Sequence, residues 1–279
     1  MASIAIDIGA TKTLVAMTFN GKIKKIVQFL TPKKRSETLK KIGDAISSFK
    51  VKPKRICAAI AGTIEKKKVR QFTNLDGWKD FDLKSYLKKR YKAESFVIND
   101  GDAAAIAEMF STGYKDIVAL TIGTGMGVGA IIGGELVEGP EMGHIIIQAN
   151  GELCKCGSYG CLEAYTCTEA VKRMTKERYG REMDSYQLKE LYKKHDLTAR
   201  FIYREMGRAL GVGLTSMINT FHPDAIVLSG GLMNNEIFGV AKKNIRETLY
   251  SKPKVLLSKI REHSSLMGAM HVAEGRFVL

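Results

Sequence analysis

Apolar and polar residues alternate in two stretches of the chain whose patterns match at an offset of 114 residues. The first stretch, "IAIDIGATKTLVAMTFNGKI", covers residues 4–23, and the second, "VALTIGTGMGVGAIIGGELV", covers residues 118–137. Each contains an alternating strand, a turn rich in Gly and Thr, a second apolar strand and a polar turn. The repeat predicts a duplicated chain in which both copies begin with the same hairpin.

Strand and helix patterns alternate along the rest of the chain. Strands are predicted at residues 55–62, 95–100 and 225–231, and helices at 35–50, at 103–110, over much of 165–220 and in the last 20 residues. Small residues between Arg208 and Asn219 predict that this helix packs closely on a neighbour. The alternation predicts an α/β fold with ligand-binding groups at the carboxyl ends of its strands.

A chain of 279 residues with 45% hydrophobic content is long enough for two modest domains. No apolar run approaches the roughly 18 residues of a membrane-spanning helix, and the first residues lack a signal-peptide pattern. We therefore expect a cytoplasmic protein with no membrane partner. The net charge is 44 − 29 = +15, but the basic residues are scattered in short pieces without interleaved aromatics. This pattern favours a solvated surface that attracts anionic ligands over a nucleic-acid partner.

The densest chemical signal is "HIIIQANGELCKCGSYGC", in which three of the five cysteines fall within eight residues. Such spacing argues against a disulfide framework and for a metal site in a reducing compartment. The predicted ligands are His144, Cys154, Cys156 and Cys161. Three thiolates and one imidazole suit a closed tetrahedral site, so the predicted zinc is structural. Cys57 and Cys167 are predicted to be buried thiols.

Several carboxylates allow two interpretations. In "VINDGDAAAIAEMF", Asp102 suits the N-cap of a helix, whereas Asp100 at a strand end is placed to accept a proton from an attacking alcohol. Glu141 and Glu163 flank the cysteine loop. Each alone is typical of a surface charge, but together they suit two hydroxyl groups of a polyol.

The motifs "DIGATKT", "NDGDAA", "TIGTGMGVG", "EMGH" followed by "CKCGSYGCLE", and "IVLSGG" resemble, in order and spacing, those of the ROK family of sugar kinases and sugar-responsive repressors. The resemblance runs from about Ile4 to Ala273. It implies the duplicated ribonuclease-H-like, actin-like ATPase fold, with two lobes and a cleft between them. The N-terminal lobe would span residues 1–110 and be completed by a C-terminal helix at 262–279. The C-terminal lobe would span 111–261 and carry the zinc loop, and the protein would be a homodimer.

The resemblance also implies roles for single residues. Asp100 would be the catalytic base. The sugar would be bound by Gly62, Asn74, Asn99, Asp100, Glu141, His144 and Glu163, with Asn74 on a substrate-covering loop, "FTNLDGW". ATP would be bound by Gly9, Thr11, Lys12, Thr124, Gly125, Gly230 and Gly231. The structural zinc would lie on His144 and the three cysteines of its loop.

Asp7, two residues before Gly9, also has two interpretations. A carboxylate beside a phosphate turn suits a hydrated Mg²⁺ that travels with ATP. Alternatively, Asp7 is a turn residue that bonds its own backbone. The second copy has Thr121 at the equivalent position, so only the first copy carries a group suited to the metal.

Together these features predict an ATP-dependent kinase that phosphorylates a hexose at its primary hydroxyl, O6. Glucose is the first choice, with N-acetylmannosamine, N-acetylglucosamine, mannose and fructose as alternatives. A sugar-responsive repressor without its DNA-binding domain is the distant alternative, because the first phosphate strand is expected to begin by Ser3. The sequence has Asn-Asp-Gly-Asp where the family usually has Asn-Asp-Ala-Asn, and "AIAGTI" lacks the family's proline. Both departures weaken any inference about which sugar fits.

Overall fold

The computed structural model describes residues 2–65, 68–72, 76–246, 252–260 and 263–279. Contacts within the chain divide it into two compact units. Unit 1 consists of Met1–Gly113, Glu135–Gly139 and Ile260–Leu279, and unit 2 consists of Tyr114–Gly134 and Pro140–Lys259. Each unit is described by itself.

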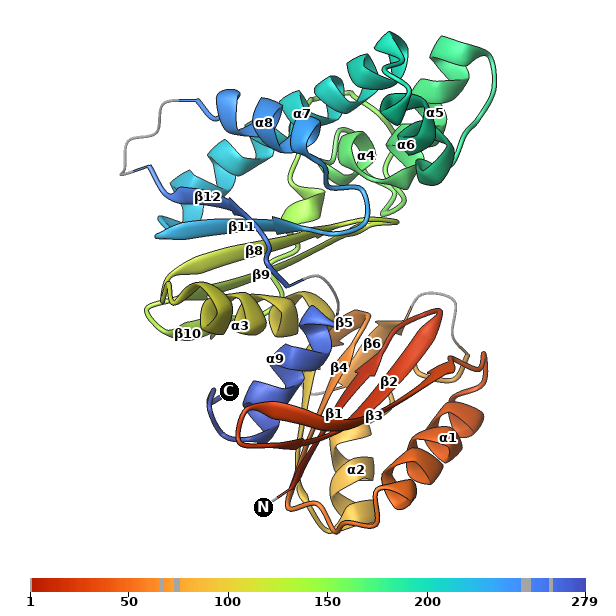
Figure 1. Cartoon of the computed structure of the whole chain (residues 1–279), viewed down its shortest axis with the longest axis vertical. Coiled ribbons are helices and arrows are strands. Elements are labelled where there is room, and N and C mark those ends of the chain that lie inside the picture. The colour runs from red at the N-terminus through yellow and green to blue at the C-terminus, as the bar shows by residue number, and fades with distance from the viewer. Residues whose placement is uncertain (1, 66–67, 73–75, 247–251, 261–262) are drawn as a thin grey trace. The chain divides into compact units, whose positions relative to one another are not determined.

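A five-stranded sheet in the order β3-β2-β1-β4-β7 forms the centre of unit 1 (Figure 1). Strands β1, β2 and β3 pair antiparallel, whereas β4 and β7 extend the sheet in parallel from β1. The strands are β1 (Ser3–Ile8), β2 (Lys12–Phe19), β3 (Lys22–Leu30), β4 (Arg55–Ile60) and β7 (Glu94–Asn99). A separate antiparallel pair consists of β5 (Gly62–Glu65) and β6 (Lys68–Phe72).

Helices cover the two faces of this sheet differently. They are α1 (Arg35–Ser48), α2 (Leu83–Tyr91), α3 (Asp100–Thr112) and α9 (Ser264–Ala273). The isoleucines of β1 and β4 form one core with α1 and α2. Because side chains alternate along a strand, Ala5, Cys57 and Ala59 face the other way, where α9 packs on β1 and β4. A Cβ added to Gly268 of α9 would lie 1.8 Å from the Ala103 carbonyl oxygen, so small residues let α9 and α3 approach closely.

The second sheet repeats the plan of the first, in the order β10-β9-β8-β11-β12. Its strands are β8 (Ile117–Ile122), β9 (Met126–Ile132), β10 (Glu135–Val137), β11 (Ala225–Ser229) and β12 (Lys254–Leu257). Strands β8 and β9 pair antiparallel, and β11 and β12 continue in parallel from β8. Strands β8 and β9 begin 114 residues after β1 and β2, because 117 − 3 and 126 − 12 both equal 114. The duplicated α/β fold expected from the sequence is confirmed.

Unit 2 carries its helices beside this sheet. They are α4 (Glu163–Thr166), α5 (Thr168–Tyr179), α6 (Ser185–Lys193), α7 (Leu197–Phe221) and α8 (Asn235–Lys243), with a 3₁₀ turn η1 (Met142–His144). A Cβ on Gly211 of α7 would lie 2.7 Å from Cβ of Asn244, and one on Gly213 would lie 2.4 Å from Leu162 Cδ2. The close packing predicted for this helix is confirmed.

Several element boundaries differ from the sequence prediction, mostly by two residues; the differences at α3 and α9 matter most. The helix predicted at 103–110 begins earlier, at Asp100, and its N-cap is Asn99. The interpretation of Asp102 as the N-cap is wrong, because the Asn99 side chain accepts the backbone N–H groups of Gly101 and Asp102. At the carboxyl end, α9 stops at Ala273, so the last six residues of the chain are not helical.

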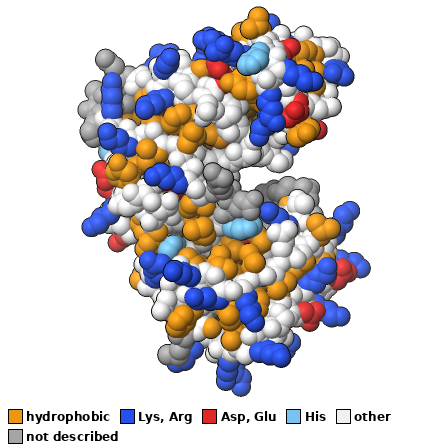
Figure 2. All heavy atoms as spheres, viewed as in Figure 1, with side chains coloured by type: hydrophobic (Ala, Val, Ile, Leu, Met, Phe, Trp, Pro, Cys, Tyr) orange, Lys and Arg blue, Asp and Glu red, His pale blue; other side chains and the backbone are white. Residues whose placement is uncertain are grey.

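The surface view shows Lys and Arg side chains dispersed over the face that is drawn (Figure 2). They alternate there with hydrophobic and uncharged groups and do not form a single stripe. Of the helices in the described ranges, none is both long and apolar enough to cross a membrane.

Candidate functional site

The first Gly-Thr turn connects β1 to β2. Gly9 N–H donates to the Lys12 carbonyl at 3.0 Å, and a Cβ on Gly9 would lie 3.0 Å from that same oxygen. Thr31, just after β3, fixes the turn from the side: its hydroxyl donates to the Gly9 carbonyl at 2.7 Å, and its N–H donates to the Thr11 carbonyl at 3.0 Å. Thr11 and Lys12 are exposed, so the turn presents a hydroxyl and an ammonium group from a fixed backbone.

Asp7 and Asp100 form a carboxylate pair in unit 1. Burial, followed by the negative charge of Asp100, raises the pKa of Asp7 to about 7, while Lys12 acts in the opposite direction. Two carboxylates that repel each other gain stability when a cation binds near both. Oxygen donors of this kind are the ligands that Mg²⁺ prefers. Asp7, with the negative charge of Asp100 near it, is therefore suited to the Mg²⁺ that the sequence predicts at Asp7.

The amino end of α3 places Asp100 and Asn99. Asn99 Oδ1 accepts from Gly101 N–H at 2.7 Å, and its Nδ2 donates to the Gly62 carbonyl at 2.9 Å. Asn99 thus joins the end of β7 to the start of β5. Asp100 is the first residue of the helix, where the backbone dipole favours a negative charge.

The second Gly-Thr turn connects β8 to β9 in unit 2. Gly123 N–H donates to the Gly125 carbonyl at 3.0 Å, and the Gly123 carbonyl accepts from Thr168 N–H at 3.1 Å and from its hydroxyl at 3.2 Å. Met126 N–H donates to Glu163 Oε2 at 2.8 Å. A Cβ on Gly125 would lie 2.9 Å from the same carboxylate oxygen, so this glycine permits the contact.

The His-Cys cluster lies beside this turn. One ligand atom from each of His144, Cys154, Cys156 and Cys161 lies within 4.8 Å of the others. His144 Nδ1 is 3.6 Å from Cys154 Sγ, and Cys156 Sγ is 3.6 Å from Cys161 Sγ. A backbone hydrogen bond at Ser158 lowers the pKa of Cys156 to about 7, whereas burial raises the pKa values of Cys154 and Cys161.

A short ladder holds the loop that carries these cysteines. Isolated bridges join Ile146 to Cys161 and Leu153 to Tyr159. Gly160 has φ = 79°, and a Cβ there would lie 1.8 Å from the Gln148 carbonyl oxygen. Only glycine fits this position. The geometry and the donor set both suit tetrahedral zinc.

Glu163 joins the cluster to the second turn. Its Oε2 accepts from Met126 N–H, and its Oε1 is 3.9 Å from Cys154 Sγ. Glu141 is exposed and stands at the N-cap of η1, two residues before the buried Gly143. His144 Nδ1 is the ring nitrogen that lies toward the Cys154 thiol.

Of the two glycines after β11, Gly230 packs on the end of β8. Gly230 has φ = 106°, and a Cβ there would lie 2.2 Å from the Ile122 carbonyl oxygen. Gly231 has open space around its added Cβ. Thr121, the counterpart of Asp7, shares a 3.1 Å hydrogen bond with the hydroxyl of Ser229. The same strand position therefore holds a carboxylate in the first copy and a hydrogen-bonded hydroxyl in the second.

The two units divide the expected site residues. Unit 1 holds Asp7, Gly9, Thr11, Lys12, Gly62, Asn99 and Asp100. Unit 2 holds Thr124, Gly125, Glu141, His144, Glu163, Gly230, Gly231 and the three cysteines of the cluster. Asn74 lies outside the described residues.

Sequence reasoning missed Thr31 and Thr168, whose hydroxyls anchor the two turns. Each of these threonines lies at the boundary of a strand or helix. Threonines are too common at such boundaries for the position alone to identify an anchor. Cys57 and Cys167, predicted to be buried, are 0% and 1% exposed, so that prediction is confirmed.

The two sheets and their Gly-Thr turns define a duplicated α/β protein in which each copy has one anchored turn. Within that class the chain belongs to the ROK family, whose model matches residues 3–276. The resemblance in the sequence motifs is thereby confirmed.

Curated relatives include both repressors and kinases. A xylose repressor of Bacillus spizizenii is 29% identical over 235 residues, covering 78% of this chain and 60% of the repressor. The chain thus spans less than two thirds of the length of the repressor. A glucokinase of Thermotoga maritima is 26% identical and matches 98% of this chain and 97% of the glucokinase.

A solved structure agrees with this placement. A ROK family glucokinase from Streptomyces griseus, in complex with glucose and AMPPNP, has a TM-score of 0.82 and 27% identity. The match covers 99% of this chain and 100% of that chain. The duplicated fold is therefore that of ROK kinases.

Proposed function

We propose that this protein phosphorylates a hexose at its primary hydroxyl, O6, with ATP as the donor. The observation that carries the proposal is the combination in unit 1 of an anchored Gly-Thr turn with Asp7 and Asp100. A phosphate turn alone suits many anionic ligands. A second carboxylate at a helix start adds the group that phosphoryl transfer to an alcohol needs.

Asp100 is the general base of the proposed reaction. Its carboxylate accepts the proton of the sugar hydroxyl as the oxygen attacks the γ-phosphorus of ATP. The bond from that phosphorus to the β,γ-bridging oxygen breaks, and ADP leaves. Asp7 is the residue that would hold Mg²⁺, which would supply neutralising charge to the phosphates. Gly9, Thr11, Lys12, Thr124 and Gly125 are the residues proposed to orient the phosphates. Gly230 and Gly231 form the turn proposed for the adenosine.

The residues proposed for the sugar are those that the family resemblance implies. Asn99 holds the Gly62 backbone in position, so that Gly62, Asn99 and Asp100 act as one polar edge. Glu141, His144 Nε2 and Glu163 bind further hydroxyls, and Asn74 is proposed for the same sugar. Structural zinc on His144, Cys154, Cys156 and Cys161 would fix the imidazole through Nδ1.

Glucose is the proposed substrate. The Thermotoga and Streptomyces relatives carry the name glucokinase, and the latter is in complex with glucose. The competing sugars are N-acetylmannosamine, N-acetylglucosamine, mannose and fructose. The site residues bind hydroxyl groups, which all these sugars carry, so the residue types do not distinguish one sugar from another. We also propose a cytoplasmic homodimer with the N-terminal lobe at 1–110 and 262–279 and the C-terminal lobe at 111–261.

A coupled assay of ADP release across these sugars tests the proposal. We expect turnover that depends on Mg²⁺ and a kcat/KM for glucose that exceeds the others. Higher kcat/KM for an N-acetylhexosamine would replace glucose but keep the kinase. A lack of turnover with every sugar on the panel would overturn the kinase proposal.

The second candidate is a sugar-responsive repressor, which the xylose repressor match favours. A gel shift of genomic fragments at physiological salt separates it from the kinase, because specific retention survives salt that weakens phosphate contacts. We expect no retained fragment. Retention of one defined fragment, released by a sugar, would favour the repressor.

A further inference from the structure

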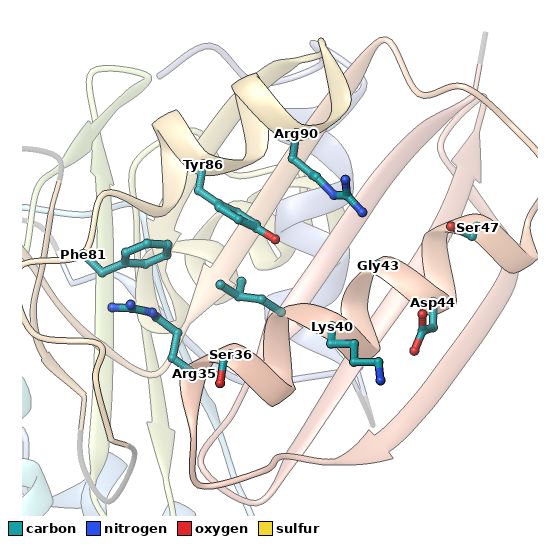
Figure 3. A pocket seen from close by; sticks show the side chains of 10 residues that line it. Arg35, Ser36, Lys40, Gly43, Asp44, Ser47, Phe81, Tyr86 and Arg90 are labelled. Carbon is teal, nitrogen blue, oxygen red and sulfur yellow. The ribbon is translucent and has the colours of Figure 1, made fainter.

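A groove of about 460 Å³ lies on unit 1, lined by residues other than those assigned above (Figure 3). Helix α1 forms one wall, and the segment from Phe81 through α2 forms the other. Its lining consists of Arg35, Ser36, Leu39, Lys40, Gly43, Asp44, Ser47, Phe81, Tyr86 and Arg90. Neither the proposed ATP site nor the proposed sugar site uses any of these residues.

The lining of the groove carries a net positive charge, which favours an anionic ligand. Three cationic side chains, Arg35, Lys40 and Arg90, face one carboxylate, Asp44, which leaves an excess of 3 − 1 = 2 positive charges. Figure 3 shows Arg90 extending from α2 toward α1, where Lys40 and Asp44 lie. A phosphomonoester, with a charge close to −2 at neutral pH, matches this excess.

Arg35 is already held in place in the structure. Its guanidinium carbon lies 4.1 Å from the centre of the Phe81 ring, and its Nη1 donates to the Gly77 carbonyl. A guanidinium has five N–H donors, so this anchoring leaves others for a ligand. Because an anchored side chain loses less conformational entropy on binding, Arg35 is preorganised for a contact with a phosphate.

The groove also has an apolar floor and polar groups suited to hydroxyls. Phe81 and Tyr86 lie with ring centres 5.8 Å apart, and both are half-buried beside the buried Leu39. Tyr86 directs its hydroxyl toward α1 (Figure 3). Aromatic faces pack on the C–H groups of a sugar ring, and Asp44 and the serine hydroxyls can bond its hydroxyl groups.

Gly43 widens the groove at the middle of α1. A glycine inside a helix costs roughly 0.5–1 kcal/mol relative to alanine. Packing does not require it, because the nearest heavy atom to an added Cβ is Tyr91 Oη at 3.4 Å, an ordinary contact. The glycine therefore costs helix stability while it keeps the wall of the groove open.

We propose that this groove binds a phosphomonoester that carries several hydroxyl groups, such as a sugar phosphate. The cations bind the phosphate, the rings contact the carbon skeleton, and Asp44 with the serines binds the hydroxyls. The proposal does not depend on the kinase activity. If that activity is present, its product belongs to the same chemical class.

The test is calorimetric titration of the full chain with glucose 6-phosphate, inorganic phosphate and glucose. The variant Lys40→Ala/Arg90→Ala removes two cations of the groove. The matched control, Lys41→Ala/Lys89→Ala, removes two exposed lysines from the same two helices outside the lining. Both variants keep every residue of the candidate active site, so binding there is equal in the two proteins.

We expect glucose 6-phosphate binding to weaken at least tenfold in the groove variant and to stay within twofold of wild type in the control. Equal affinities in the two variants would overturn the groove as the binding site. Inorganic phosphate that binds as tightly as glucose 6-phosphate would overturn the contacts to the rings and hydroxyls. Filling the groove with Gly43→Gln gives an independent check, in which unchanged affinity would also contradict the proposal.

Discussion

The two Gly-Thr turns derive from the same repeated hairpin but are anchored differently. The turn after β1 is held by Thr31, which lies just after the third strand of the same meander. The turn after β8 is held by Glu163 and Thr168, which follow the cysteine loop. The first turn lies beside the carboxylate of Asp7, whereas the second copy has Thr121 bonded to Ser229. The strand geometry is the same in the two copies, while the residues around each turn differ: a carboxylate, Asp7, lies beside one, and groups that follow the cysteine loop hold the other.

The largest expected effect comes from exchanging the diverged residue. Asp7→Thr gives the first copy the residue of the second and removes the proposed magnesium ligand, so kcat should fall by at least about 100-fold. Thr121→Val removes one hydroxyl at the equivalent position and should stay within about tenfold of wild type. Steady-state kinetics with varied Mg²⁺ compares the two. Equal losses would contradict the division of roles.

The second effect concerns the cysteine loop. Cys156→Ser should remove bound zinc and raise KM for the sugar, because Glu163 and His144 lose the loop that positions them. Metal analysis of the purified protein should find one zinc per chain in wild type. The control Cys57→Ala changes a buried thiol outside the cluster and should keep the metal. A wild-type protein without zinc would refute this assignment.

The third prediction uses a buried histidine of unit 1. Burial, followed by the charge of Arg276, lowers the pKa of His271 to about 4, and the ring stacks on Phe110 with centres 3.9 Å apart. Because the folded state binds this proton less well than the unfolded state, stability is intact above pH 6.5 and falls toward pH 4. The loss is about 1.4 kcal/mol per pH unit, to roughly 3 kcal/mol.

Denaturant titrations across this range measure that loss. His271→Phe keeps the aromatic contact and should flatten the acid limb of the stability profile. His195→Asn changes an exposed histidine in unit 2 and serves as the control. If the free energy of unfolding of His271→Phe falls as steeply with decreasing pH as that of wild type, this role of His271 is wrong.

The smallest effects test the anchors themselves. Thr31→Val removes the hydroxyl bonds to Gly9 and Thr13, and Thr168→Val removes one bond to Gly123 while its backbone N–H bond remains. We expect KM for ATP to rise about fivefold for Thr31→Val, in line with a hydrogen bond of about 1 kcal/mol. The rise for Thr168→Val should be smaller. The reverse order would show that the second turn depends more on its anchor.

The sequence predicted most of the fold because its signals are local. Period-two alternation defined the paired hairpins, and Gly230 marked the turn after β11 without any knowledge of its neighbours. The cysteine spacing likewise predicted a cluster that the structure brings together within 4.8 Å.

Contacts distant in sequence were beyond local reasoning. Glu163 was assigned to a polyol from its position beside the loop, yet its Oε2 also accepts from Met126 N–H, 37 residues away. Asn99 caps α3 and also donates to the Gly62 carbonyl. The N-cap is therefore Asn99 and not the predicted Asp102. Capping depends on which side chain reaches the free N–H groups, and spacing alone does not determine that.

The most direct test of the proposed function is single-turnover phosphoryl transfer by Asp100→Asn, with Asp102→Asn as the matched change in the same helical turn. Removal of a general base typically costs 100- to 10,000-fold, so we expect a rate loss of about that size for Asp100→Asn. Glucose affinity should stay within about tenfold in both variants, because a base acts mainly in the transition state. Asp102→Asn should keep most of the rate. A rate for Asp100→Asn within tenfold of wild type would contradict its role as the base.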